Sequence, residues 1–128
     1  MRNERGAITM PMLAVALLAL LLGAFVGDVA IYLRARARAG VAADAAALAA
    51  APLTFASFGA DAGPVVEARR FAEANGAVLT TCACAADPTW RPRVVRVAVS
   101  VPAELVLFGI RQVPATSRAE FDPTALPP

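Results

Sequence analysis

A long uncharged apolar run begins near the start of the chain. Between Arg5 and Asp28 the sequence is GAITMPMLAVALLALLLGAFVG, and Thr9 carries its only polar side chain. At 1.5 Å of rise per residue, residues 7–27 span roughly 32 Å as a helix, close to the thickness of a bilayer core. The pattern predicts a transmembrane helix. The alternatives are a buried core helix and a cleaved secretory signal, although the apolar region of a signal is usually shorter.

The same helix is expected to continue beyond the apolar run. Residues 28–51 contain no proline and a single glycine, Gly40, so we predict one rod from Pro11 to Pro52, roughly 60 Å long. Pro11 falls in the first turn, where a missing N–H is tolerated. Apolar positions three or four apart predict the packing face of the extension. They are Val29, Leu33, Ala37, Val41, Ala45 and Leu48.

Alanine dominates the end of this rod, in the stretch VAADAAALAAAP of residues 41–52. Alanine favours helix but buries little surface, so such a helix is suited to close packing rather than to a bulky core. We expect it to pack against its own ectodomain or another chain. An ordinary helix carrying a coding bias toward alanine is the alternative.

The remaining chain predicts a small α+β ectodomain. A turn-rich linker, residues 52–64, contains Leu53, Phe55 and Phe58, which we expect to point inward. A short helix follows over 64–74, ended by the Asn-Gly pair at 75–76.

Alternating patterns then predict an antiparallel sheet. Its strands are AVLTTCACA, RVVRVAVSV and VPATSRAEF, and Pro114 places the last at an edge. The second strand should present one face made of Val95, Val97, Val99 and Val101. PAELVLFGI is either a short helical turn or a loop with exposed apolar groups, and the C-terminal tail, 123–128, is expected to fray.

Composition narrows the functional classes. The chain has twelve basic residues, ten acidic residues and no histidine, with a net charge of +2. Histidine is the commonest general base and metal ligand, so we expect no enzyme, no metal site, no cofactor and no small-molecule substrate. Apart from Arg34, Arg36 and Arg38 the basic residues are scattered, so no nucleic-acid partner is expected.

Three isolated residues carry open alternatives. Cys82 and Cys84 have three alternative roles. They are simply small buried residues, or they form a disulfide with each other or with another chain, or they form a redox site. Asp28 either marks the boundary with water or pairs with a basic group of a neighbouring subunit. For orientation, Arg2 and Arg5 precede the span while three arginines follow it, so the positive-inside count alone slightly favours a cytoplasmic C-terminus. The short N-terminal flank and the cysteine pair favour an extracytoplasmic C-terminus.

The order of these parts resembles the TadE/TadG-like proteins of Flp (Tad) pilus assembly, especially the short TadE-like type of actinobacteria. The resemblance rests on ERGA at 4–7, ADAAALAAA at 43–51 and EANGA at 73–77. It implies a membrane-anchored minor pseudopilin that packs its helix among other subunits of a pilus or a type II/IV-like secretion system. It also implies processing between Gly6 and Ala7. Because Pro11 stands where such pilins carry glutamate, an uncleaved signal anchor is the alternative.

The sequence therefore predicts an α+β fold in five parts. They are a cytoplasmic flank or leader (1–6), a transmembrane helix (7–27), its extracytoplasmic extension (28–51), an ectodomain (52–122) and a tail (123–128). We expect a structural protein of the cell membrane whose partners are the membrane and other pilus or secretion-system subunits. The alternative is a signal-anchored extracytoplasmic binding module of the cell envelope, recognising its ligand through the sheet or PAELVLFGI.

Overall fold

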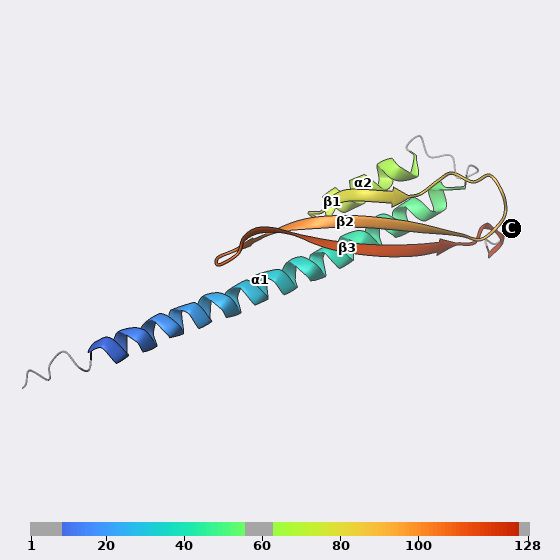
Figure 1. The fold of residues 1–128 in the computed structure, drawn as a ribbon. Coiled ribbons are helices and arrows are strands. Elements are labelled where there is room, and N and C mark those ends of the chain that lie inside the picture. The colour runs from blue at the N-terminus through green and yellow to red at the C-terminus, as the bar shows by residue number, and fades with distance from the viewer. Residues whose placement is uncertain (1–8, 56–62, 126–128) are drawn as a thin grey trace, which may run out of the picture.

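A single long helix forms the spine of the molecule. The computed structural model describes residues 9–55 and 63–125, and its helix α1 runs without a break over Thr9–Leu53 (Figure 1). The predicted rod is confirmed. Pro52 lies inside the last turn of α1, so the helix passes it by one residue. The Thr54 hydroxyl then donates to the Ala51 carbonyl at 2.7 Å, which satisfies one of the free carbonyls at the helix end.

The second helix, α2, covers Pro64–Ala74, as predicted. Proline stands at its start, where the missing N–H has no helical partner to lose. At the other end the Asn75 side chain donates to the Phe71 carbonyl at 2.8 Å. Gly76 has φ +73°, a left-handed conformation that favours glycine and turns the chain into the sheet.

Three antiparallel strands follow in the spatial order β1-β2-β3. They are β1 (Val78–Ala83), β2 (Arg93–Leu105) and β3 (Gly109–Phe121). The predicted strands are confirmed, and β3 is the edge strand that Pro114 indicated.

PAELVLFGI is neither a helical turn nor a loop throughout. It supplies the end of β2, a turn at Val106–Phe108 and the start of β3. Pro102 is tolerated within β2 because it lies past Ser100, where the pairing with β1 stops, and therefore has only β3 beside it.

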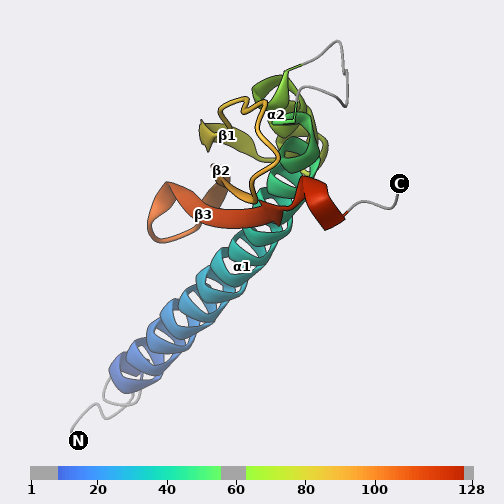
Figure 2. The same ribbon diagram turned by 90° about the vertical axis from the view of Figure 1, so that its right-hand side faces the viewer.

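The core lies between α1 and the sheet and is made of small residues. The four alternating valines of β2 are buried on the face toward α1, as predicted. Helix α2 packs against α1 and β1 with Ala68 and Ala72 buried (Figures 1 and 2). The outer half of α1 is thus covered by the sheet and α2, while its N-terminal half extends away from them (Figure 1).

The linker agrees with its prediction where the structure describes it, and the tail does not. Phe55 is buried and Leu53 is half-buried, as expected, while Phe58 lies outside the described residues. The predicted frayed tail is wrong for its first residues. Pro123–Ala125 form a short 3-10 helix, and the Pro123 side chain is fully buried. Proline restricts φ before folding, which reduces the entropy lost when this turn is ordered.

Candidate functional site

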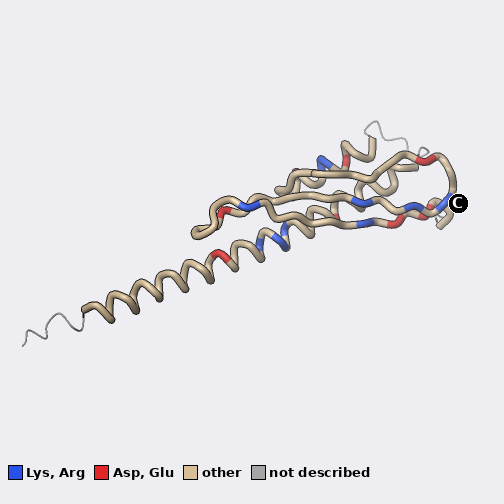
Figure 3. Tube along the Cα trace, in the orientation of Figure 1, with Lys and Arg blue, Asp and Glu red and all other residues tan. Residues whose placement is uncertain are grey.

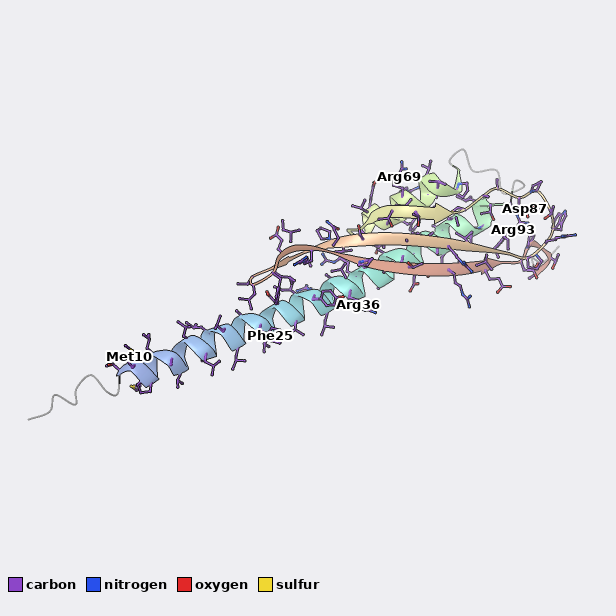
Figure 4. All side chains as sticks on the ribbon, in the orientation of Figure 1. Met10, Phe25, Arg36, Arg69, Asp87 and Arg93 are labelled. Carbon is purple, nitrogen blue, oxygen red and sulfur yellow. A yellow bond between two sulfur atoms is a disulfide. The ribbon has the colours of Figure 1, made fainter. Side chains whose placement is uncertain are left out.

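The N-terminal half of α1 is apolar on all sides and is not covered by the rest of the chain. Met10 and Leu20 are exposed by about three quarters of their surface, and Figure 4 shows Met10 far from every other element. Within the described residues, α1 is one helix long and apolar enough to cross a membrane. A helix that is apolar all round must be buried in protein or lipid, and here protein does not bury it.

The outer half of α1 uses a row of alanines to contact the ectodomain. The buried members are Ala35, Ala39, Ala42, Ala43, Ala46, Ala47, Ala50 and Ala51. Because a methyl group is the whole side chain, the backbone of α1 approaches α2 and the sheet closely. The alanine-rich stretch is therefore a packing element within its own chain.

The packing face predicted from apolar spacing is wrong for contacts within this chain. Leu33, Val41 and Leu48 are exposed by 57%, 60% and 67%, on the side of α1 that the sheet and α2 leave open, while Val29 is 41% exposed and borders the turn between β2 and β3. Ala37 is also exposed, and Ala45 is half-buried. The buried alanines and the predicted packing face both repeat every three or four residues, so periodicity alone does not distinguish them. The row with smaller side chains packs inside the chain because it lets backbones approach.

We call Val29, Leu33, Ala37, Val41 and Leu48 the exposed stripe. Asp44 is also exposed and lies three residues after Val41 and four before Leu48, so it interrupts the stripe with a carboxylate. Arg34, Arg36 and Arg38 are exposed on the same half of the helix, just beyond the uncharged N-terminal half (Figure 3). Arg34 and Arg38 line a cavity with the end of β2, so the charge within the exposed stripe is that of Asp44.

Asp28 is buried, and its role was missed from the sequence. It is 3% exposed, and its carboxylate accepts the backbone N–H of Val106 at 2.5 Å and of Leu107 at 2.8 Å. The turn between β2 and β3 is thereby fixed to α1. Of the two predicted roles, the boundary with water fits its place in the sequence, but its partners are these two backbone donors rather than a basic side chain. The sequence signal was weak: a lone acid directly after an apolar run.

The opposite end of the ectodomain is held by Arg93. Its guanidinium donates to the carbonyls of Thr54, Asp87, Thr89 and Arg91, joining the end of α1 to the loop between β1 and β2 (Figure 4). The Arg93 guanidinium carbon also lies 5.4 Å from the centre of the Phe55 ring, and the Phe55 and Trp90 rings meet edge to face with centroids 4.8 Å apart. A hydrogen bond from the Thr89 N–H, with further help from the Thr89 hydroxyl and Arg93, lowers the pKa of Asp87 from its ordinary value of 3.8.

A disulfide joins Cys82, in β1, to Cys84, just past its end. Cys84 is buried against the core and Cys82 is half-buried. Both line a cavity of about 520 Å³ together with Asp87 and Arg93. Of the open alternatives, the structure contains the intrachain disulfide.

The described residues offer several contact surfaces. Across residues 9–55 and 63–125, His, Cys, Asp and Glu form no group of three or more that could hold a metal ion. The one ion pair within those ranges, Arg70 with Glu67, is a surface contact on α2 with N–O 3.3 Å. Gly6 and Ala7, the predicted processing site, lie outside the described residues.

Comparison with known proteins finds a family that the N-terminal part of the chain resembles. A family model described as "Putative Flp pilus-assembly TadE/G-like" matches residues 6–52, a segment that takes in almost all of α1. The predicted resemblance is confirmed over this segment. Searches of curated proteins and of solved structures gave no match.

Proposed function

We propose, from the TadE/G-like match over residues 6–52, that this chain is a minor pseudopilin-like structural component of a Flp/Tad-type pilus or a related type II/IV-like secretion system. It crosses the membrane once, through the N-terminal half of α1, and its ectodomain is extracytoplasmic. Its role is structural rather than catalytic. The observation that carries this proposal is the exposed stripe on the outer half of α1.

The exposed stripe has the chemistry of a helix-packing surface. Burying a valine or leucine side chain contributes roughly 1.5 to 3 kcal/mol, so covering Leu33, Val41 and Leu48 would stabilise a complex appreciably. Ala37 provides a small position at which a second helix can approach. Asp44, placed among these side chains, favours a partner helix that carries a basic group.

One feature supports the proposed orientation. The disulfide between Cys82 and Cys84 is a form that persists in oxidising, extracytoplasmic compartments. Cleavage between Gly6 and Ala7 is part of the proposal, and N-terminal sequencing of the membrane-purified chain tests it.

Site-specific photo-crosslinking in the native host tests the packing role. A photoreactive residue replaces Val41 on the exposed stripe. The matched control replaces Val66, which is also an exposed valine on a helix but lies on α2. We expect Val41 to give crosslinks to other pilus-system subunits and Val66 to give few. A third probe replaces Ile110, and crosslinks from Ile110 with none from Val41 would contradict the proposal and favour a binding module of the envelope.

A pair of substitutions provides an independent test. Val41→Asp introduces a charge at the exposed stripe, and Val66→Asp introduces the same charge on α2. Both sites are exposed in the folded chain, so each should change the free energy of unfolding by no more than about 0.5 kcal/mol. We expect only Val41→Asp to abolish co-purification with other subunits.

A further inference from the structure

The turn between β2 and β3 presents apolar side chains to the outside. Val106, Leu107, Phe108 and Ile110 are exposed by 73%, 43%, 52% and 69%. We call residues 106–110 the hairpin tip. Gly109, at φ +67°, is its only residue of a type that usually forms turns. A cluster of large apolar groups at a loop is a mark of an interaction site.

The hairpin tip is fixed beside one particular level of α1. The Asp28 carboxylate accepts the N–H groups of Val106 and Leu107, so the tip cannot slide along the helix without losing both bonds. Beside these bonds is an apolar groove of about 210 Å³. It is lined by Phe25, Asp28, Val29, Tyr32, Leu105 and Phe108. Figure 1 shows the tip reaching along α1 toward its N-terminal half.

That level coincides with the end of the membrane span. The uncharged stretch of α1 from Thr9 to Gly27 is roughly 28 Å long at 1.5 Å per residue, which nearly fills the hydrocarbon core of a bilayer. Asp28 follows at once, and a charged side chain is strongly disfavoured deeper in lipid. The tip tied to Asp28 therefore lies at the boundary between hydrocarbon and headgroups.

The surrounding charges and rings match this boundary. On the hairpin, charge begins only at Glu104 and Arg111, on the side of the tip away from the span, and on α1 it resumes at Arg34 (Figure 3). Between them, Tyr32 and Phe108 contribute aromatic rings to the groove. Tyrosine is enriched at membrane interfaces because its ring is apolar and its hydroxyl is polar.

We propose that the hairpin tip inserts into the headgroup and acyl boundary of the bilayer and forms a second membrane contact beside α1. Val106, Leu107, Phe108 and Ile110 enter the lipid, while Glu104 and Arg111 stay in the headgroup layer. Two contacts restrain the tilt of the ectodomain, where a single helix would leave it free to rock. The proposal rests on the membrane span of α1 and not on the pilus partners.

Depth-dependent fluorescence quenching tests the insertion. The full chain carrying Leu107→Cys is labelled with an environment-sensitive fluorophore without reductant, so the native disulfide does not react. It is reconstituted into phosphatidylcholine and phosphatidylglycerol vesicles that contain nitroxide lipids, labelled either near the headgroup or near the methyl end. Thr116→Cys, exposed on β3 away from the tip, is the aqueous control. Leu20→Cys in the apolar half of α1 reports the span.

We expect the Leu107 label to emit at shorter wavelength than the Thr116 label and to be quenched severalfold more by the headgroup-proximal nitroxide. The Leu20 label should be quenched most by the deep nitroxide. If Leu20 is quenched and Leu107 behaves like Thr116, the span stands and the tip proposal is overturned. If Leu20 is not quenched, both are overturned. A blue shift at Leu107 that disappears when the protein is diluted in lipid would assign the tip to a second copy instead.

Discussion

The carboxylate of Asp28 accepts the backbone N–H of Leu107 at 2.8 Å, across 79 positions of sequence. This bond and its companion from Val106 connect the helix to the hairpin tip at the point where α1 leaves its uncharged half. The carboxylate is buried, so it has little access to water that could replace these donors. The two N–H groups therefore stabilise the buried carboxylate, and without the carboxylate both donors would lack an acceptor.

Asp28→Asn should loosen the hairpin tip without unfolding the chain. An amide presents one acceptor oxygen and an NH₂ group, so one of the two N–H donors loses its partner. We expect the local stability of the turn to fall by about 1 to 3 kcal/mol. Amide hydrogen exchange in detergent micelles measures this at Val106 and Leu107. Asp44→Asn, an exposed acid on the same helix, is the control and should leave both amides unchanged. Unaltered exchange in Asp28→Asn would contradict the assigned role.

Local patterns were sufficient to predict most elements. Helix α2 needs only a proline at its start and the Asn-Gly pair at its end. The buried face of β2 follows from valine at every second position, which no helix period matches. The span of α1 follows from an uncharged run long enough to cross a bilayer. These features are decided by neighbours in the sequence.

The contacts between elements could not be predicted from local sequence patterns. The alanine row and the exposed stripe have the same spacing, and choosing between them requires knowing which row the sheet covers. Asp28 finds its partners in the backbone of a distant turn, and backbone donors leave no sequence signal. Arg93 is similar, because each of its four acceptors is a carbonyl. Such contacts depend on tertiary structure.

The same substitution should destabilise the chain on one face of α1 and have little effect on the other. Ala43 is fully buried, whereas Ala37 is exposed on the stripe. Ala43→Leu forces three extra carbons into a closely packed interface and should lower the free energy of unfolding by about 1 to 3 kcal/mol. Ala37→Leu should change it by less than about 0.5 kcal/mol, since leucine and alanine have similar helix propensities. Chemical denaturation in micelles measures both. Equal effects would contradict the assignment of the buried face.

Acid should loosen the loop that contains Asp87. The pKa of this carboxyl is lowered in the folded chain by the Thr89 N–H, which donates to it at 2.8 Å. A group with a depressed folded pKa stabilises the fold above its unfolded pKa, near 3.8, and loses that contribution as pH falls through the folded value. We therefore expect the Thr89 amide to become less protected below about pH 4. Asp87→Asn should remove this dependence, and an identical acid response in the variant would refute it.

Arg93→Lys tests the hydrogen bonds that Arg93 makes at the end of the ectodomain opposite the hairpin tip. A lysine ammonium is a compact group with three donors and cannot reproduce the planar fork that reaches the carbonyls of Thr54, Asp87 and Thr89 together. We expect a loss of about 1 to 3 kcal/mol in the free energy of unfolding.

Trp90 fluorescence reports on these Arg93 contacts, because Trp90 is the only tryptophan of the chain and its ring lies against Phe55. In Arg93→Lys the loop should separate from the end of α1, so Trp90 emission should move to longer wavelength and become more accessible to iodide. Arg118→Lys, an exposed position on β3, is the matched control and should leave the emission unchanged. If Arg93→Lys keeps the native emission and stability, the four carbonyl contacts do not hold the loop. The Phe55–Trp90 contact would then be the feature that fixes it.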